Sequence, residues 1–279
     1  MQLNCGRFEL DLTTPKVMGI LNVTPDSFSD GGQFKAHDLA LEHAKQMIEQ
    51  GVDIIDVGAE STRPNAAFVS EEEEWARLEP ILSSLQNFNV PISLDTRRTS
   101  IMKKALAEGW VDLVNDVSAL EDEGAVELLA KQSNTAICLM HKQGNPENMQ
   151  KEPYYEDVVA EVSQYLQDRV QVCKQAGIDT KRLLVDPGFG FGKTLAHNLA
   201  LMNTLDQWAK DQEVPVLIGI SRKNMLGKLV NEPEPKNRMV ASVVAALAAC
   251  ARGAKIVRVH DVKETVQALT IWQHMGVFI

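Results

Sequence analysis

Carboxylate and amide side chains end several short apolar runs of this 279-residue chain. Asp95, Asn115 and Asp186 each stand where a run that is typical of a buried strand gives way to a loop. Any one of them could cap the following helix or accept a hydrogen bond from a loop amide. The three together favour a binding site for a flat heterocycle with amino and oxo groups, because carboxylates accept hydrogen bonds from ring N–H and exocyclic NH₂ groups.

Basic side chains gather in three loops of a chain whose net charge is −10, within the segments 61–64, 221–224 and 258–261. Side chains two positions apart on a strand leave the same face, so Arg258 and His260 are expected to point the same way. Arginine, histidine, threonine and an amide that converge on one mouth would bind an anion such as phosphate. Arg222 taken alone is expected to have a surface role.

The stretch 18–32 joins an apolar run to a polar loop that two glycines close. The run ends at Asn22, and the loop contains Thr24-Pro25-Asp26 and Asp30-Gly31-Gly32, which are turn-forming sequences. A loop set on a rigid strand end is a common place for small-molecule chemistry. A cation held by Asn22, water and a ligand phosphate would suit Mg²⁺, which keeps several waters and few protein ligands.

A glycine-rich segment, 186–193, follows the sixth predicted strand. Its glycine spacing does not match GxGxxG and it does not belong to a first βα unit, so a dinucleotide site is not expected. A flexible loop that presents Phe191 to an aromatic ligand is the better interpretation. The chain contains no GxSxG or Walker sequence and no zinc-type spacing of His, Cys and Asp.

The elements that must position these residues are short apolar runs alternating with amphipathic stretches. Apolar residues at adjacent positions are typical of parallel strands with both faces covered. The predicted strands are 17–22, 54–58, 92–95, 113–116, 136–140, 183–186, 216–221 and 256–260. The predicted helices are 38–50, 70–85, 100–108, 124–131, 154–176, 195–210, 235–252 and 262–275, and Ser70-Glu71-Glu72-Glu73 indicates a capping box at the start of the second.

Eight strands alternating with helices over about 250 residues predict a single (β/α)₈ TIM barrel of the α/β class. Residues 2–12 are expected to precede it as a short hairpin. No Pro-, Gly- or Ser-rich linker divides the chain, so one domain is expected over residues 1–279. The active site of such a barrel forms at the carboxyl ends of its strands, where the polar residues described above are placed.

The charge balance, the cysteine spacing and the lack of long apolar runs indicate which partners and which cellular location to expect. With 28 basic against 38 acidic residues, neither nucleic acid nor an anionic membrane is expected as the main partner. The cysteines at positions 5, 138, 173 and 250 form no CxxC pair and are expected to be isolated buried thiols. No signal-peptide pattern or apolar run of membrane length is present, so a cytoplasmic location is expected.

Together the motifs resemble those of the dihydropteroate synthase family, folate-pathway enzymes that sulfonamides target. The matching segments follow in family order over nearly the whole chain, at 18–32, 56–64, 184–193, 219–223 and 256–261. The resemblance implies a (β/α)₈ barrel and a homodimer. It also implies a reaction that joins p-aminobenzoate to 6-hydroxymethyl-7,8-dihydropterin diphosphate and releases pyrophosphate, with sulfonamides as competitive inhibitors.

The same resemblance implies roles for individual residues. The positions that hold the pterin are matched by Asp95, Asn115, Asp186 and Lys223. Arg258 and His260 match the diphosphate site, Arg258 also lies along the pterin face, and Asn22 matches the Mg²⁺ ligand. The region around p-aminobenzoate is matched by Phe28, Thr62, Arg63, Pro64, Phe191 and Asn224, and Thr62 is also assigned to the pterin diphosphate.

The implied chemistry needs no nucleophilic residue. Pyrophosphate leaves readily once Mg²⁺ and cationic side chains neutralise it, and the pterin ring can delocalise a methylene cation, so catalysis rests on positioning and electrostatic stabilisation. In the family the first two loops fold over the site, and Asp30 matches a residue that faces the cation. The expected catalytic set is Asp30, Lys223, Arg258 and His260. Relatives commonly have Ser or Thr where Asn224 stands, and Asn can still donate to a carboxylate and begin a helix.

Two alternatives share the carboxylate–amide pocket. A pterin-binding methyltransferase barrel would move a methyl group from a folate, and the anion-binding motifs after the second and eighth strands argue against it. A non-catalytic pterin-binding homologue would have lost its loops, and both loops are present in the sequence.

Overall fold

The strands of the chain form one parallel sheet and one hairpin. The computed structural model describes residues 1–24, 32–60, 69–144, 149 and 152–275, with the side chains of 32–35 excluded. The hairpin consists of β1 (Gln2–Cys5) and β2 (Phe8–Asp11). The parallel strands are β3 (Lys16–Asn22), β4 (Ile54–Gly58), β5 (Ile92–Asp95), β6 (Leu113–Asp116), β7 (Ala136–Met140), β8 (Leu183–Asp186), β9 (Leu217–Ile218) and β10 (Ile256–Val259).

The parallel strands close into a barrel. Their order is β8-β7-β6-β5-β4-β3-β10-β9, so neighbours in sequence are neighbours in the sheet except at the two ends of the order. The seam between β8 and β9 is closed by a parallel bridge between Val185 and Val216, and the Val185 amide donates to the Pro215 carbonyl at 3.1 Å. The predicted (β/α)₈ barrel is confirmed.

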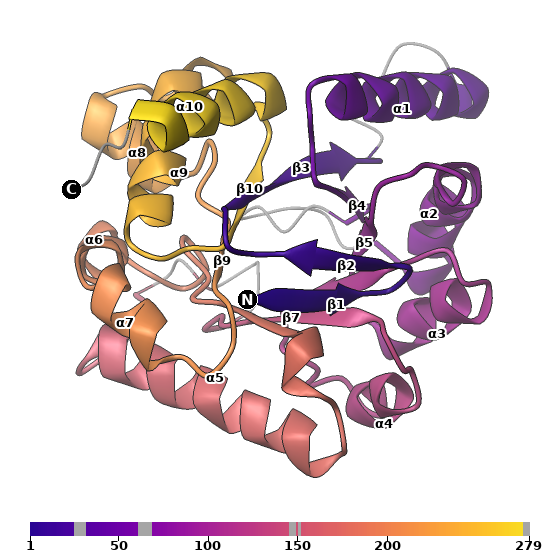
Figure 1. Ribbon diagram of the computed structural model, residues 1–279, viewed down its shortest axis with the longest axis horizontal. Coiled ribbons are helices and arrows are strands. Elements are labelled where there is room, and N and C mark those ends of the chain that lie inside the picture. The colour runs from indigo at the N-terminus through magenta and orange to yellow at the C-terminus, as the bar shows by residue number, and fades with distance from the viewer. Residues whose placement is uncertain (25–31, 61–68, 145–148, 150–151, 276–279) are drawn as a thin grey trace.

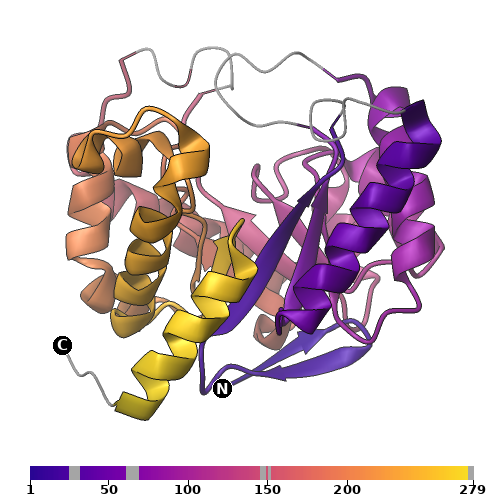
Figure 2. The same cartoon turned by 90° about the horizontal axis from the view of Figure 1, so that it is seen from above.

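Helices surround the barrel as an outer ring (Figures 1 and 2). They are α1 (Gly32–Glu49), α2 (Glu71–Leu85), α3 (Thr99–Ala107), α4 (Ala125–Ala130), α5 (Val158–Gln175), α6 (Leu195–Asn203), α7 (Leu205–Asp211), α8 (Asn224–Val230), α9 (Met239–Ala251) and α10 (Val262–Met275), with short 3₁₀ turns at Thr180–Arg182 and Pro235–Arg238. The predicted capping box of α2 is present, because Ser70 accepts from the Glu73 amide and Glu73 accepts from the Ser70 amide. No helix in the described part of the chain is long and apolar enough to cross a membrane.

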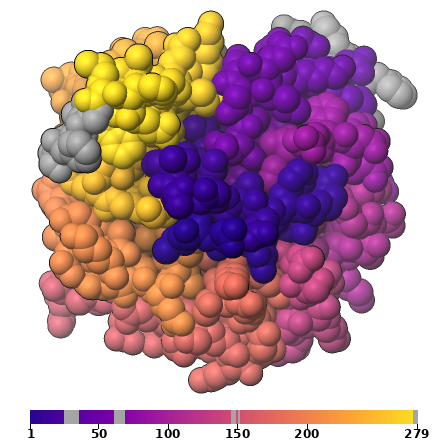
Figure 3. All heavy atoms as spheres, in the orientation of Figure 1, coloured from indigo at the N-terminus to yellow at the C-terminus, as the bar shows by residue number. Residues whose placement is uncertain are grey.

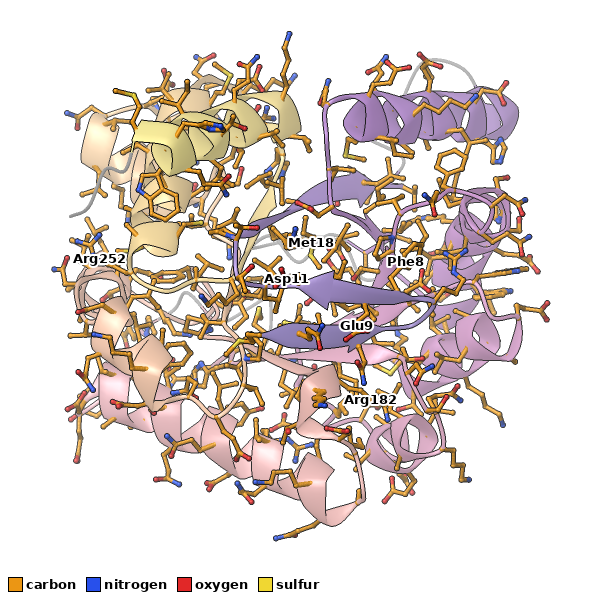
Figure 4. The ribbon with its side chains drawn as sticks, viewed as in Figure 1. Phe8, Glu9, Asp11, Met18, Arg182 and Arg252 are labelled. Carbon is orange, nitrogen blue, oxygen red and sulfur yellow. The ribbon has the colours of Figure 1, made fainter. Side chains whose placement is uncertain are left out.

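The hairpin seals one end of the barrel. Leu3 and Cys5 from β1, together with Leu12, are fully buried in the same apolar cluster as Met18 and other side chains of the barrel interior. In the space-filling view the hairpin lies across the middle of this face (Figure 3), and Met18 lies behind it in the stick view (Figure 4). The predicted hairpin is therefore confirmed, and the site must form at the other end of the barrel.

Some element boundaries differ from those predicted. The strand predicted at 216–221 is paired only at Leu217–Ile218 and the Val216 bridge. The helix predicted over 195–210 is divided into α6 and α7 at Thr204, whose hydroxyl donates to the Ala200 carbonyl at 2.9 Å. The helix predicted from residue 154 begins at Val158, because the Asp157 carboxylate caps it by accepting from the Val159 and Ala160 amides.

Candidate active site

Polar side chains line the barrel above its apolar interior. Leu113 belongs to the interior cluster, so Asn115, two residues further along β6, faces the same interior. The same step joins an interior apolar residue to a polar one in β4 (Ile54 and Asp56), β8 (Leu184 and Asp186) and β10 (Ile256 and Arg258). Because all these strands are parallel, their polar residues meet at the carboxyl end of the barrel.

Arg258 joins two of the carboxylates directly. Its Nε donates to Asp56 Oδ2 at 2.6 Å, and its Nη2 donates to Asp95 Oδ2 at 2.6 Å. Asp56 also accepts from Ser93 Oγ at 2.6 Å and from Asn115 Nδ2 at 3.3 Å. These side chains form one network, which we call the Asp56 network: Asp56, Ser93, Asp95, Asn115 and Arg258.

The charges of this network are held in a poorly solvated position. Burial raises the pKa of Asp95 above its usual range, and the Arg258 guanidinium opposes that shift. Burial disfavours the charge of Arg258, yet Asp56 and Asp95 raise its pKa above the ordinary value. Arg258 therefore remains a cation beside both carboxylates.

Lys223 lies beside the glycine-rich loop after β8. Its ammonium donates to the Phe189 carbonyl and lies 4.5 Å from the centroid of the Phe191 ring. Burial lowers the pKa of Lys223 to about 8, and the nearby Asp186 carboxylate opposes that shift. A Cβ at Gly190 would lie 3.2 Å from Lys223 Cδ, so the absence of a side chain there leaves room for the lysine stem. The presentation of Phe191 to an aromatic ligand stays a prediction.

Asp186 ends β8 at the base of that loop. It is 5% exposed, accepts from the Gly188 amide at 2.7 Å through Oδ1, and has a pKa raised by burial. The cations of Lys223 and Arg258 both lower that pKa in turn, which places them in its electrostatic neighbourhood. A Cβ at Gly219 would lie 3.5 Å from Asp186 Oδ2 and 3.9 Å from Arg258 Cβ, so this glycine separates the two charged side chains without filling the space.

Other predicted site residues lie at the same end of the barrel with partners of their own. His260 approaches Ser221 Oγ with its backbone amide at 3.2 Å and with Nδ1 at 3.1 Å. Asn224 is exposed and begins α8, as expected, and its Oδ1 accepts from Arg238 Nη1 at 3.1 Å. Arg222, for which a surface role is expected, is half-buried and forms an ion pair with Asp261.

Five of the predicted site residues lie outside the described residues: Phe28, Asp30, Thr62, Arg63 and Pro64. Their places in the site stay predictions. Among the described residues, the Asp56 network contains three predicted site residues, Asp95, Asn115 and Arg258. Two others, Lys223 and Phe191, contact each other.

The metal ligand predicted at Asn22 is the half-buried last residue of β3, next to Gly58 in the sheet register. No cluster of three or more His, Cys, Asp or Glu side chains that could hold a metal occurs in the described ranges. This donor set is compatible with Mg²⁺ bound through one amide oxygen, water and substrate phosphates, since Mg²⁺ keeps much of its hydration shell.

The sequence interpretation gave no role to Asp56 or to the pair formed by His141 and Lys193. Asp56 is fully buried inside β4, and Lys193 Nζ lies 2.9 Å from His141 Nδ1 with both side chains buried. A signal was available, because a charged residue in an apolar run requires a partner when it is buried. The sequence does not say which residue that partner is.

Comparisons with known proteins agree with this geometry. A family model described as pterin binding enzyme matches residues 18–260. The dihydropteroate synthase of Neisseria meningitidis serogroup C is 58% identical over 273 residues, which cover 98% of this chain and 96% of that protein.

Solved structures give the same result. The Xanthomonas albilineans dihydropteroate synthase with 4-aminobenzoic acid is 43% identical with a TM-score of 0.92, over 99% of this chain and 98% of that one. The Yersinia pestis dihydropteroate synthase in a sulfonamide drug complex is 46% identical with a TM-score of 0.91, over 99% of both chains. The chain therefore belongs to the dihydropteroate synthase family of pterin-binding enzymes.

Proposed function

We propose that this protein is a transferase that joins p-aminobenzoate to 6-hydroxymethyl-7,8-dihydropterin diphosphate, giving 7,8-dihydropteroate and pyrophosphate. The observation that carries this proposal is the Asp56 network, which places two carboxylates, an amide and a guanidinium in one poorly solvated layer. Family membership over nearly the whole chain supports the same reaction.

The buried polar layer suits the pterin ring. Asp95, Asn115 and Asp186 supply acceptors and an amide, which can pair with the ring N–H, amino and oxo groups of a pterin. Arg258 adds a planar guanidinium at the edge of this layer, and Lys223 adds a compact ammonium. Asn115 and Asp186 are each 5% exposed, so little water contacts them. A ligand that covers them must supply hydrogen bonds to their polar atoms, because an unpaired buried polar group is costly.

The departing diphosphate would meet the cationic side of the mouth. We assign Arg258 and His260 to it, with Asn22 as the residue that would hold Mg²⁺. When bound, Mg²⁺ would supply charge neutralisation for the leaving group. Arg258 is held in place by Asp56 and Asp95, so its donors are oriented before substrate arrives.

The amine would attack from the aromatic side. The carbon–oxygen bond of the hydroxymethyl group breaks and its electron pair leaves with pyrophosphate, while the pterin ring delocalises the positive methylene carbon. The arylamine lone pair then forms the carbon–nitrogen bond, and the proton that the nitrogen loses passes to the released pyrophosphate or to water. Phe191 and Asn224 are the described residues assigned to p-aminobenzoate, and Lys223 lies between the pterin layer and Phe191.

Pyrophosphate release tests this function. Purified protein with Mg²⁺, the pterin diphosphate and p-aminobenzoate should release pyrophosphate and form dihydropteroate at equal rates. Release of neither product would overturn the proposal. Growth of a strain that lacks the synthase, when supplied with this gene, would exclude a non-catalytic pterin-binding protein. Methyl transfer from a methylated folate without pyrophosphate release would favour the methyltransferase alternative.

Sulfonamides are proposed as competitive inhibitors, because the Yersinia pestis relative is in complex with such a drug. Inhibition should be overcome by p-aminobenzoate and unaffected by the pterin diphosphate once that substrate is saturating. Inhibition that p-aminobenzoate does not relieve would argue against a shared site.

A homodimer is proposed from the exposed apolar side chains of α8, α9 and α10. Val240 and Val244 are 68% and 60% exposed, and their spacing of four places them on one face of α9. Leu229 of α8 and Ile271 of α10 are also exposed, and both helices pack against α9. We expect Val244→Asp to reduce the mass measured by light scattering to that of a monomer, whereas Leu39→Asp on α1 should not. A dimer unaffected by Val244→Asp would place the interface elsewhere.

The single domain over residues 1–279 and the cytoplasmic location stay predictions. The four cysteines are buried and unpaired, as expected from their spacing.

A further inference from the structure

A buried lysine outside the polar layer uses all its hydrogens within the protein. Lys193 is 2% exposed, and its Nζ lies 2.9 Å from His141 Nδ1, 3.0 Å from the Gly188 carbonyl and 3.2 Å from the Phe191 carbonyl. Burial lowers the pKa of Lys193 to about 7, and in the ammonium form present below that pH the three N–H donors match these three acceptors. With no hydrogen left for a ligand, Lys193 is not placed to act as a proton donor or an anion ligand.

The three acceptors come from two different loops. His141 directly follows β7, whereas Gly188 and Phe191 belong to the loop after β8. These loops approach so closely that a Cβ at Gly188 would lie 1.9 Å from the His141 carbonyl oxygen, and one at Gly192 would lie 2.3 Å from the Gln143 carbonyl oxygen. Lys193 therefore fastens the two loops together at their closest approach.

His141 is suited to accept this hydrogen bond. Burial and the neighbouring Lys193 cation lower the pKa of His141 to about 3, so the imidazole is neutral over the ordinary working range. With Nδ1 facing the ammonium as an acceptor, the ring proton is assigned to Nε2. The Tyr165 ring packs against the imidazole edge-on with 5.0 Å between centroids and restricts its rotation.

The two halves of the loop after β8 depend on Lys193 to different degrees. The first half is also held by Asp186, which accepts from the Gly188 amide, and by the fully buried Phe189 side chain. In the second half, Phe191 is only half-buried, and its own backbone is fixed by Lys193 and by a 3.2 Å bond from its amide to the Gly188 carbonyl. Asn198 accepts from the Gly190 amide and the Tyr155 hydroxyl donates to the Gly192 carbonyl, so the residues on either side have one further bond each. Loss of Lys193 should loosen Phe191 itself and leave Asp186 and the Phe189 carbonyl in place.

We propose that Lys193, with His141, is a positioning residue that fixes the Phe191 ring against Lys223 and thereby sets the affinity for the arylamine substrate. This inference rests on the proposed function, because Phe191 is assigned there to p-aminobenzoate. The pterin side of the site should depend less on Lys193, since Asp95, Asn115, Asp186 and Arg258 lie on the strands themselves and the link to Lys193 is the electrostatic effect of its cation on Asp186.

The test uses Lys193→Met, which keeps the length of the side chain and removes its donors. The KM for p-aminobenzoate should rise about tenfold or more, as expected for a lost hydrogen bond to a charged group. The KM for the pterin diphosphate should change by less than about twofold. Lys142→Met is the matched control, because Lys142 neighbours His141 but donates to Ser118 Oγ and to no residue of the loop after β8. This variant should leave both KM values unchanged.

Two variants at position 141 separate positioning from folding. His141→Asn keeps an acceptor near the place of Nδ1 and should retain most of the affinity for p-aminobenzoate, whereas His141→Phe removes the acceptor and should behave like Lys193→Met. An equal rise of both KM values in Lys193→Met, or equal behaviour of the Asn and Phe variants, would overturn the proposal. If Lys193→Met does not fold, the pair of variants at position 141 decides the outcome.

Hydrogen exchange distinguishes this inference from the proposed function. In ligand-free protein, the Phe191 and Gly192 amides should exchange faster in Lys193→Met than in the unaltered protein, while the Gly188 amide should not. Absent turnover with this exchange pattern would contradict the proposed function alone. Unchanged exchange at Phe191 would contradict the positioning role alone.

Discussion

Asp56 offers the sharpest test of how the site is built, because it contacts no assigned substrate group and yet holds two residues that do. It is fully buried and accepts from Ser93, Asn115 and Arg258. Asp56→Asn keeps the shape of the side chain but removes the charge. The new NH₂ group also faces at least one of the three donors, Ser93, Asn115 or Arg258, and cannot accept its hydrogen bond.

The expected loss of stability follows from the partners that remain. Removal of one partner from a buried ion pair typically costs about 3–5 kcal/mol. Arg258 keeps Asp95 as a second partner at 2.6 Å and its side chain is 21% exposed, so the lower end of that range, about 3 kcal/mol, is expected here. For a chain of this size that loss corresponds to a fall in Tm of about 6–12 °C.

Activity should fall as well, because Arg258 and Asn115 lose the carboxylate that orients them. A displacement of about 1 Å in a positioned group can reduce the rate about 100-fold, and we expect a loss of that order in kcat/KM for the pterin diphosphate. Steady-state pyrophosphate release measures this loss, and denaturant unfolding measures the change in stability.

The chain contains a matched control at the opposite end of the barrel. Asp112 is 1% exposed and, like Asp56, accepts from an arginine, with Arg7 Nη2 at 2.8 Å and Nε at 3.0 Å. Asp112 precedes β6, and Arg7 belongs to the turn of the hairpin that seals the closed end. Asp112→Asn should therefore lower the free energy of unfolding and change kcat/KM by less than about twofold.

The reasoning would be refuted by either of two results. Full activity of Asp56→Asn would show that Arg258 is oriented without Asp56. A loss of kcat/KM in Asp112→Asn as large as that in Asp56→Asn would show that activity follows stability alone.

Three further predictions concern the cations of the site. Lys223→Ala should abolish turnover while Tm falls by less than about 4 °C, corresponding to about 1 kcal/mol; a collapse of Tm together with activity would contradict this expectation. Burial lowers the pKa of Lys223 to about 8, so its ammonium is present below that pH and is lost above it. The kcat/KM for the pterin diphosphate should therefore fall as pH rises through about 8, and Lys223→Arg, which stays charged, should remove this alkaline limb; an unchanged limb in that variant would assign it to another group. Chelation by EDTA should stop pyrophosphate release without lowering Tm, and added Mg²⁺ should restore it; turnover that persists in EDTA would argue against the metal.

Much of the barrel could be predicted from local pattern. The ranges predicted at 54–58, 92–95, 113–116, 136–140 and 183–186 coincide with β4 to β8, because apolar runs of that length between turn signals leave little choice. The division between α6 and α7 could not be predicted, since Thr204 is neither Gly nor Pro and the amphipathic pattern continues past it. The strand predicted over 216–221 was too long, because strand pairing is confined to Leu217–Ile218 and the bridge at Val216.

The site was predictable in its residue types and less so in its connections. The polar ends of the strands identify Asp95, Asn115 and Asp186 because β periodicity and barrel topology together fix where they point. Partner choice is a tertiary property: Asp56 and Arg258 are 202 positions apart in sequence and meet only because β4 and β10 both flank β3. The same holds for Lys193, which ends a glycine-rich stretch and whose acceptor His141 lies on another loop.

Residues assigned to a substrate and residues that hold them in position therefore differ in how well the sequence predicts them. Asp95, Asn115 and Asp186, which are assigned to the pterin, lie at strand ends, where position in the sequence predicts their place. From buried positions, Asp56 and Lys193 support residues assigned to a substrate, and each is bonded to residues of other strands or loops. A buried charge without such partners would lower the stability of the fold. Each buried charged side chain therefore implies a partner residue, and the bond between the two also fixes the position of that partner. Asp56→Asn and Lys193→Met test this relation on the pterin side and the arylamine side separately, and it fails if both variants affect the two substrates alike.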